Sequence, residues 1–353
     1  MTATIEEERL ASGWLALTLR NEAMEVVLLP HKGSEIYALR ARRHELDLLW
    51  KAPWGLRPPP VHAGTGAASQ AAWLDHYAGG WQELFPNAGD ACQHAGAPHP
   101  FHGEASLVPW DYELVVGPGG VPAVQLGVRL ARAPFRLEKR VRLDPERPVL
   151  FLEERVTNEG RTPLPFMWGH HPAYGAPFLQ EGCLLEVPAA AYEANEPQTS
   201  PHSWVIPGER SPWPHVSRAG GGTVDLSRVP GPGAAVANLG YLLDMAEGWY
   251  ALTNPRLGLG IGLAWPREVF SCLWLWQELG GTPDYPWYGA AYVMGVEPHT
   301  SHPGQGLVRA IERGTARTLE PGESLAANVT AVLFEPRGSV RRVTLDGDVE
   351  FGP

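Results

Sequence analysis

Two adjacent histidines, His170 and His171, occur in the segment Gly169-His170-His171-Pro172-Ala173-Tyr174-Gly175. A histidine titrates near neutral pH, so its imidazole can donate or accept a proton where most side chains cannot. Pro165 and Pro172 bound the pair, and we therefore expect a rigid turn after a strand. We predict that His171 is a general acid. A local hydrogen bond to the backbone would account for the same residue without any chemistry.

A carboxylate that could act with this histidine lies far along the chain, at Glu297. It ends the apolar run Tyr292-Val293-Met294-Gly295-Val296 and precedes Pro298. An unpaired carboxylate at the end of an apolar strand is costly to bury, so Glu297 is either paired or functional. The sequence leaves a structural salt bridge and a catalytic base as open alternatives.

A third histidine, His102, lies in Pro100-Phe101-His102-Gly103-Glu104. Gly103 allows a ligand or another backbone segment to approach closely, so His102 is a candidate binding residue as well as an ordinary loop histidine. Histidine and glutamate clusters can also hold a transition metal. The possible ligands are His94, His99, His102, Glu104, His299 and His302. None of their spacings is a tight ligand motif, so we predict no metal site and no cofactor.

Aromatic and amide side chains occur together in two segments. In Leu273-Trp274-Leu275-Trp276-Gln277, a strand would place the tryptophans on one face and the leucines on the other. In residues 79–89, Asn87 could reach a ligand. A sugar suits such surfaces, because the apolar face of a pyranose stacks on aromatic rings and its hydroxyls form hydrogen bonds. We predict that Asn87, Trp276 and Gln277 contact a sugar, although the tryptophans could serve in packing alone.

The composition limits the classes of partner. The 353 residues include 28 Lys and Arg against 39 Asp and Glu, a formal net charge of −11. Nucleic acids and anionic membrane surfaces attract clustered Lys and Arg, so neither is expected as a partner. The 44% of hydrophobic residues is ample for a core. A small-molecule sugar is therefore the expected ligand, bound by a monomer or a homodimer.

The cysteines and the apolar runs bear on the compartment. Only Cys92, Cys183 and Cys272 occur, widely spaced, and they form no disulfide framework or zinc motif. The first residues are acidic and lack the apolar stretch of a secretory signal. No apolar run reaches the roughly 18–20 residues that a membrane helix needs. We expect a cytoplasmic protein.

The chain contains 40 Gly and 35 Pro, which divide it into short segments and favour strands over long helices. Apolar residues alternate in residues 124–130 and 135–143, where Lys139 is the exception, and a third strand follows at 149–157. Short turns between these segments predict an antiparallel meander. The other expected elements are strands at 24–30, 36–39, 46–50, 184–187 and 329–334, a helix at 69–77, a loop at 52–60 and an irregular region at 195–233. Asp346-Gly347 predicts a hairpin between residues 340–345 and 349–351.

Many short strands and few helices predict an all-β sandwich or barrel. No internal repeat and no change in composition marks a boundary. We therefore expect residues 1–353 to form a single domain.

Several segments together resemble the aldose 1-epimerase (mutarotase) family, within the galactose mutarotase-like group. They are Gly79-Gly80-Trp81-Gln82-Glu83-Leu84-Phe85-Pro86-Asn87, Phe101-His102-Gly103, Gly169-His170-His171-Pro172-Ala173-Tyr174, Gly295-Val296-Glu297-Pro298 and Leu319-Glu320-Pro321-Gly322-Glu323-Ser324. Their order agrees with that of the family. The resemblance implies a large antiparallel β-sandwich of the galactose mutarotase-like type with few short helices, and a site in a cleft on one sheet.

The resemblance also implies roles for individual residues. The family's acid histidine directly precedes the proline, which selects His171 rather than His170. The Glu-Pro segment assigns the base to Glu297, and His102 would bind a sugar hydroxyl or lie near the ring oxygen. Many members carry an arginine near the position of Ala88, so one expected contact to a sugar hydroxyl is missing here or supplied by another residue. Asp244 is a possible match for the family's additional sugar-binding aspartate.

The implied reaction interconverts the α and β anomers of a free aldohexose by acid–base ring opening. Glu297 takes the proton of the C1 hydroxyl, His171 protonates the ring oxygen, and the ring closes on the other face. Two alternatives stay open. One is a non-catalytic carbohydrate-binding or regulatory protein on the same scaffold, which the missing arginine favours. The other is a metal-dependent sugar-active enzyme that uses the histidine cluster.

Overall fold

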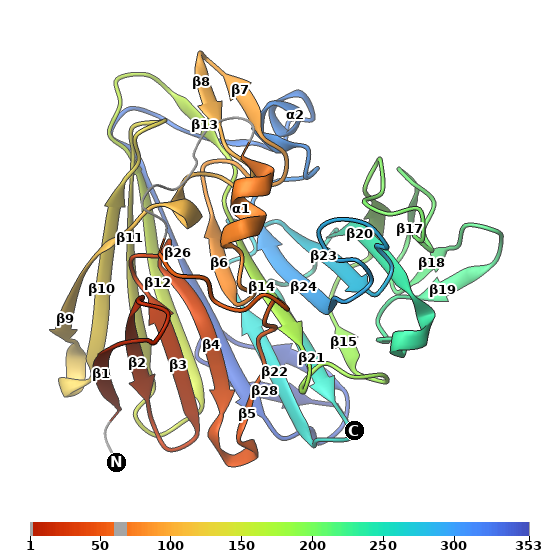
Figure 1. Ribbon diagram of the computed structural model, residues 1–353, viewed down its shortest axis with the longest axis horizontal. Helices are drawn as coiled ribbons and strands as arrows, with labels where there is room; N and C mark the ends of the chain where they lie inside the picture. Colours follow the sequence, from red (N-terminus) through yellow and green to blue (C-terminus); the bar gives the residue numbers. More distant parts are fainter. Residues whose placement is uncertain (1–2, 60–68, 353) are drawn as a thin grey trace.

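A computed structural model describes residues 3–59 and 69–352. These residues form two large antiparallel sheets that pack face to face, together with smaller sheets and connecting loops (Figure 1). The described residues include two short α-helices, α1 (Gln70–His76) and α2 (Gly306–Glu312). The all-β sandwich expected from the sequence is confirmed.

The larger sheet has the strand order β1-β2-β3-β4-β6-β14-β24-β23-β20-β16-β17, with β5 paired to β4. Its strands are β1 (Thr4–Arg9), β2 (Leu15–Arg20), β3 (Met24–Leu29), β4 (Glu35–Ala41), β5 (Leu46–Asp47), β6 (Trp81–Leu84), β14 (Gly169–Gly175), β16 (Ala191–Ala194), β17 (Arg210–Pro212), β20 (Val236–Leu243), β23 (Cys272–Leu279) and β24 (Tyr292–His299).

The smaller sheet has the order β15-β21-β22-β26-β12-β11-β10-β9. Its strands are β9 (Asp111–Val116), β10 (Pro122–Arg129), β11 (Phe135–Leu143), β12 (Val149–Asn158), β15 (Leu184–Glu186), β21 (Trp249–Asn254), β22 (Leu259–Ala264) and β26 (Ser324–Phe334). Four two-stranded pairs are β7 (Cys92–His94) with β8 (Ala97–His99), β13 (Leu164–Phe166) with β25 (Arg317–Leu319), β18 (His215–Ser217) with β19 (Thr223–Asp225), and β27 (Val340–Val343) with β28 (Val349–Phe351).

The expected meander is present as β10, β11 and β12, which are neighbours in the smaller sheet. Along β11 every second residue is buried, beginning with Phe135 and ending with Leu143. Lys139 lies on this buried face. The residue that breaks the hydrophobic alternation therefore still obeys the geometry of the strand, and its ammonium group must be paired inside the molecule.

The main core lies between the two sheets. It joins Leu17 and Val26 of the larger sheet to Leu137 and Val141 of the smaller sheet. A second apolar cluster lies on the other face of the larger sheet, where Trp73 and Leu74 of α1 pack near Ala173 of β14. The helix expected at residues 69–77 is thus present, and it covers the outer face of this sheet.

The segment around the two histidines is a strand and not the expected turn. Residues 169–175 form β14 between β6 and β24. Proline adopts extended backbone readily, and the restriction it places on its neighbour also favours extended conformations. The prolines that suggested a turn are therefore compatible with a strand whose ladder is interrupted.

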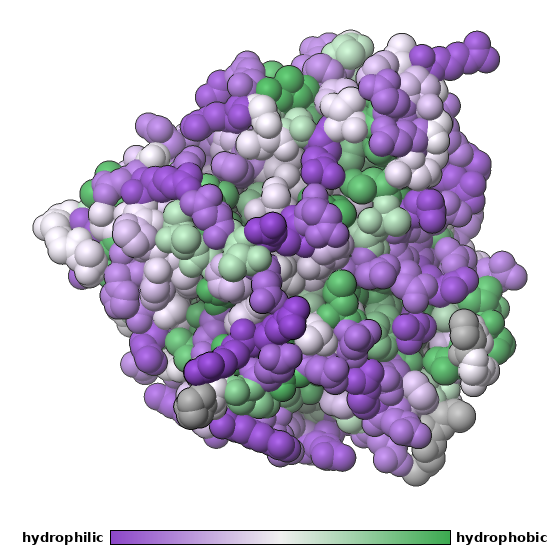
Figure 2. All heavy atoms as spheres, turned by 180° about the vertical axis from the view of Figure 1, so that it is seen from behind, coloured by the Kyte–Doolittle hydropathy of each residue, from purple (hydrophilic) through white to green (hydrophobic). Residues whose placement is uncertain are grey.

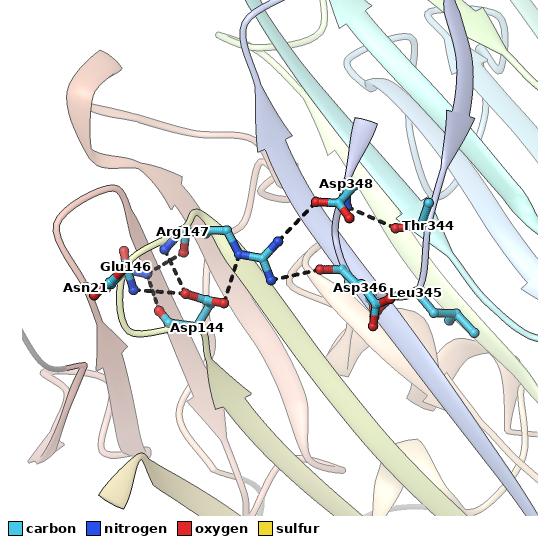
Figure 3. Close-up of polar contacts among 9 residues, drawn as sticks. Asn21, Asp144, Glu146, Arg147, Thr344, Leu345, Asp346 and Asp348 are labelled. Carbon is cyan, nitrogen blue, oxygen red and sulfur yellow. Dashed lines mark hydrogen bonds and ion pairs between the residues drawn. The ribbon is translucent and has the colours of Figure 1, made fainter. Parts of the chain in front are cut away.

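Arg147 links the ends of distant strands (Figure 3). Its guanidinium contacts Asp144 (3.0 Å) and Asp348 (3.2 Å) and donates to the carbonyl of Asp346 (2.9 Å). It thereby connects the β11–β12 turn to the turn of the expected terminal hairpin, which is formed by β27 and β28. On the face shown in Figure 2, hydrophobic residues form small groups between hydrophilic ones.

The region expected to be irregular, residues 195–233, contains the short strands β17, β18 and β19 and long connections, beside one end of the larger sheet (Figure 1). The loop expected at residues 52–60 has no strand or helix over 52–59, and residue 60 lies outside the described part. Within the described ranges, no helix combines the length and apolar character needed to cross a membrane.

Candidate active site

The strand register brings His171 and Glu297 together. Gly169 pairs with His299 and Ala173 with Gly295 between β14 and β24, so His171 lies opposite Glu297, midway between these pairs. The Nε2 atom of His171 is 3.6 Å from Oε1 of Glu297. Side chains opposite one another on neighbouring antiparallel strands share a face.

On the same face of the sheet, a row of side chains continues on both sides of this pair. Gln82 of β6 is the partner of His171, and Trp274 of β23 is the partner of Glu297. The leucines at 273 and 275 belong to the core between the sheets, so this row lies on the outer face. The expected separation of tryptophans from leucines along β23 is confirmed.

Two prolines interrupt hydrogen bonding at the same point. Pro172 of β14 and Pro298 of β24 flank the His171–Glu297 pair, and neither has a backbone N–H to donate. Between these strands, residue pairing is recorded only on either side of residues 170–172. The histidine and the carboxylate therefore occupy a local opening in the sheet.

Two glycines make room for the polar side chains. A Cβ atom at Gly295 would overlap Oε1 of Glu297, and one at Gly169 would overlap the ring of His299. Any larger residue would displace a carboxylate or an imidazole. Both glycines belong to the sequence segments that carry the family resemblance.

A cavity of about 350 Å³ opens over this row. Of the residues predicted from sequence, His102, His171, Trp276 and Glu297 line it. Aromatic side chains supply much of the remaining wall, namely Trp73, Tyr77, Phe101, Trp274, Tyr285 and Trp287. None of the described residues that line it is Lys or Arg.

Burial governs the charges of the central pair. It raises the pKa of Glu297 well above that of an ordinary carboxyl and lowers the pKa of His171 to about 4. The other carboxylate oxygen of Glu297 lies 3.4 Å from Nε2 of His299, whose ring stacks on Trp274 at 3.9 Å. Burial therefore favours the neutral form of both the carboxyl and the imidazole.

The side chain of His102 is fixed by its backbone surroundings. Its Nδ1 accepts a hydrogen bond from the backbone N–H of Gly89 at 3.1 Å, so Nε2 carries the ring hydrogen. The residue has a positive φ of 59°, a conformation that costs energy for residues other than glycine. The ring of His102 lies 5.4 Å from the ring of His171. His102 therefore carries an N–H donor close to the central pair.

Tyr77, at the end of α1, was not assigned to the site from sequence. Its ring is perpendicular to His171 at 5.5 Å, and its hydroxyl is buried without a hydrogen-bond partner among the described residues. Burial and the nearby Glu297 raise its pKa well above the ordinary value, so the phenol stays protonated. No periodic pattern in the sequence near α1 predicts that Tyr77 contacts β14, because this contact depends on how the helix packs on the sheet.

His170 points to the opposite side of β14. Its Nε2 lies 3.0 Å from Glu154, and its Nδ1 accepts a hydrogen bond from the indole of Trp81 at 3.1 Å. Lys139 contacts Glu83 at 2.5 Å and Glu154 at 3.4 Å. These side chains form a buried polar cluster between the sheets, outside the cavity.

Two residues predicted to bind sugar lie elsewhere, which corrects the prediction. Gln277 shares the face of the leucines in β23 and bonds to Asn238 at 3.0 Å. Asn87 donates to the carbonyls of Asp90 and Pro100 and accepts from the N–H of Leu307. Period-two alternation could have excluded Gln277, since Trp276 faces the cavity.

Other residues bear on the remaining expectations. His299 faces the site because it lies two residues beyond Glu297 on the same strand. Glu104 accepts the backbone N–H groups of Ala131 and Arg132. Within residues 3–59 and 69–352, no group of three or more His, Cys, Asp or Glu side chains is placed to hold a metal ion.

Ala88 is fully buried, and Asp244, paired with Arg210, is not a cavity residue.

Comparison with known proteins gives one family and a set of similar folds. The model of a family described as Domain of unknown function (DUF4432) matches residues 11–333. No curated protein matches the chain.

Solved structures of similar fold cover nearly the whole chain. The Slr1438 protein from Synechocystis sp. PCC 6803 has a TM-score of 0.66 at 18% identity and covers 91% of this chain and 96% of its own. A galactose mutarotase-like protein from Clostridium acetobutylicum has a TM-score of 0.65 at 14% identity, covering 95% and 99%. Galactose 1-epimerase from Lactobacillus acidophilus NCFM has a TM-score of 0.57 at 13% identity, also covering 95% and 99%. These similarities confirm the galactose mutarotase-like fold expected from the sequence.

Proposed function

Because the chain belongs to the family described as Domain of unknown function (DUF4432), its activity must be inferred from its site, and we propose that it interconverts the α and β anomers of a free, uncharged aldohexose. One observation carries this proposal. A histidine and a glutamate lie 3.6 Å apart in a cavity with aromatic walls. Similarity in fold to a galactose 1-epimerase supports the same reaction.

The proposed reaction needs two coupled proton transfers. Glu297 accepts the proton of the C1 hydroxyl while the bond from C1 to the ring oxygen breaks, and His171 donates a proton to that oxygen. The open aldehyde rotates about the C1–C2 bond, and the reverse transfers close the ring on the other face. Groups positioned in this way each contribute about 10²–10⁴-fold to a rate.

The proton distribution sets a requirement for this mechanism. Catalysis in this direction needs an ionised Glu297 and a protonated His171, whereas burial favours the neutral form of each. Hydrogen bonds to a carboxylate favour its ionised form. We propose that the hydroxyls of the bound sugar, together with the N–H donor of His102, stabilise ionised Glu297 and so transfer the proton to His171.

The cavity wall favours an uncharged sugar. Phosphate and carboxylate groups are usually bound by Arg or Lys, and neither residue type lines the described wall. The wall instead contains the carboxylates Asp90, Glu278 and Glu297, which would repel an anionic substrate.

Anomer exchange of fresh α-glucose and α-galactose, followed by polarimetry or exchange NMR, tests the proposal. We expect the wild type to accelerate exchange and Glu297→Gln to lose at least about 10²-fold of that acceleration, while circular dichroism shows an unchanged fold. Sugar binding without acceleration by the wild type would contradict the enzyme and support the non-catalytic alternative. Acceleration that survives in Glu297→Gln would refute the proposed role of the carboxylate.

A further inference from the structure

The row of side chains that contains His171 extends beyond Gln82 to a second carboxylate. Gln82 is opposite His171 across β6 and β14. Across β4 and β6, Ile36 pairs with Trp81, so Glu35 lies opposite Gln82. The three strands are neighbours in the larger sheet (Figure 1), and Glu35, Gln82 and His171 are at most 4% exposed. The proposed mechanism uses His171 and leaves Gln82 and Glu35 without a role.

Gln82 is buried next to His171 without lining the cavity. His171 is part of the cavity wall, whereas Gln82 is not among the described residues that form it. Trp81 and Glu83 point inward, as their contacts with the polar cluster between the sheets show. Because side chains alternate along a strand, Gln82 belongs to the outer face with His171. It can therefore influence a bound sugar only through another side chain.

The amide of Gln82 has a fixed orientation. Its Nε2 donates to the carbonyl of Gly79 at 2.6 Å, and a carbonyl oxygen can only accept, so the amino group occupies this side. On the opposite strand Glu35, which is paired with Lys32, is likewise an acceptor. The Oε1 atom of Gln82 is buried without a partner among the described residues. It therefore needs a donor from another direction, because an unpaired buried acceptor costs free energy.

His171 offers such a donor. Its Nδ1 is buried and has no partner within the described part of the chain, while its Nε2 faces Glu297 at 3.6 Å. Residues directly opposite on antiparallel strands have Cβ atoms about 4.5–5.5 Å apart, a separation that a glutamine and a histidine side chain can span. Hydrogen bonds of a catalytic group are often long in the free enzyme and tighten when the substrate binds. The Nδ1–H of His171 and the Oε1 of Gln82 are thus complementary neighbours.

We propose that Gln82 is a positioning residue for His171 and that its Oε1 accepts the Nδ1–H of that histidine. The bond turns the second ring nitrogen, Nε2, toward Glu297 and the ring oxygen of the sugar. It also stabilises the imidazolium that must form there, since a charged donor strengthens a hydrogen bond. Gln82 thereby favours the protonated histidine, as His102 and the sugar hydroxyls favour the ionised carboxylate. This inference rests on the proposed function for the reaction that His171 serves.

Spectroscopy and kinetics of Gln82→Met test this inference, because methionine has a similar length and only a weak acceptor. In the wild type at neutral pH, ¹⁵N NMR of labelled histidine should show Nδ1 of His171 protonated and Nε2 unprotonated, with His171→Asn identifying the signals. Gln82→Met should lose this tautomer preference. Its kcat for anomer exchange should fall by about 10–100-fold, as expected when a hydrogen bond to a charged group is lost. Its KM should change by less than about 2-fold, since Gln82 does not touch the sugar.

The pH dependence of kcat gives a second measure of the same bond. Loss of the acceptor destabilises the imidazolium, so the pKa of His171 in the complex should fall and the alkaline limb of the profile should move to lower pH by about 1–2 pH units. The titratable side chains of the described residues that face His171 from the neighbouring elements are Glu297, His102, His299 and Tyr77. All of them stay unchanged in Gln82→Met, so the displaced limb would report the lost acceptor.

Two further variants separate this role from a purely structural one. Gln82→Glu in its protonated form can donate to Gly79 and still present an acceptor oxygen to His171, so it should retain the tautomer and most of the activity. Gln277→Met removes a similarly buried glutamine of the same sheet, which is bonded to Asn238 on the inner face. It should lower the stability without altering the tautomer of His171 or the pH profile.

The outcomes separate this inference from the proposed function. A wild type with an unprotonated Nδ1 on His171, or a Gln82→Met protein that keeps the Nδ1–H tautomer or the wild-type pH profile, would overturn the inference while the epimerase activity stands. Retention of the tautomer would instead indicate that Oε1 of Gln82 binds the hydroxyl of Tyr77, which is also unpaired among the described residues and lies near this row. If Gln82→Met does not fold, the wild-type tautomer decides. If the wild type exchanges no anomers, the proposed function fails, and the tautomers of the wild type and Gln82→Met decide the hydrogen bond alone.

Discussion

Two buried clusters of histidine and glutamate lie on opposite faces of β14. His171 and Glu297 face the cavity, whereas His170 and Glu154 lie between the sheets with Lys139. The clusters use the same residue types at similar burial. They differ in the charges around them, and this difference separates a site suited to chemistry from one that stabilises the fold.

In the inner cluster, neighbouring charges outweigh burial at Glu154 and Lys139, whereas at Glu83 burial outweighs Lys139 and raises the pKa. Burial raises the pKa of Glu154, but His170 and Lys139 lower it by a larger amount, so the net direction is downward. Burial lowers the pKa of Lys139, and Glu83 and Glu154 more than reverse this. In the cavity, burial alone dominates, and it raises the pKa of Glu297. An uncompensated buried group of this kind is typical of functional sites.

The largest effects should come from replacing each of the two histidines in turn. His171→Asn should lower the rate of anomer exchange by at least about 10²-fold and leave the free energy of unfolding close to that of the wild type. His170→Asn should lower that free energy, because Glu154 loses its donor, while kcat per folded molecule changes little. Exchange NMR and urea unfolding measure the two quantities. Equal losses of activity in the two variants would break the comparison.

An intermediate effect is expected from the cation of the inner cluster. Lys139→Met leaves two buried carboxylates without their ammonium partner and should cost about 3–5 kcal/mol of unfolding free energy. The double variant Lys139→Met/Glu83→Gln should recover part of this loss, since one carboxylate becomes neutral. Arg129→Met on the adjacent strand β10 removes an exposed ion pair with Glu159 and should leave stability nearly unchanged. A Lys139→Met protein as stable as the wild type would show that the cluster does not stabilise the fold.

The smallest effect concerns the dependence of stability on pH. His171 has a folded pKa of about 4, below its ordinary value of 6.5, so the unfolded chain binds more protons between these values. The contribution of His171 to stability should therefore fall by about 1.4 kcal/mol per pH unit as the pH drops from 6.5 towards 4. Glu297 contributes with the opposite sign, because its folded pKa is raised.

Urea unfolding at several pH values measures this slope. His171→Asn should reduce it by the contribution of one proton. His215→Asn, at an exposed residue of β18, is the matched control. A slope that His171→Asn does not alter would show that burial of His171 does not control its protonation.

Much of the fold followed from local patterns. Alternation in residues 135–143 predicted β11 with the bounds observed, and Asp346-Gly347 marked the terminal hairpin. The turn predicted around His170 and His171 was wrong, because proline also suits an extended strand. Gln277 and Asn87 were misplaced for another reason: an amide near an aromatic side chain in sequence need not share its face or its cavity.

The sequence by itself determined which residues could carry chemistry and which segments could be strands. The alternation of side chains along a strand is a property of the backbone, so it can be read locally. Only the tertiary structure decided that His171 meets Glu297 and that His170 meets Glu154. Register between distant strands depends on the packing of the whole sandwich, and a shift by one residue would exchange the two faces of β14.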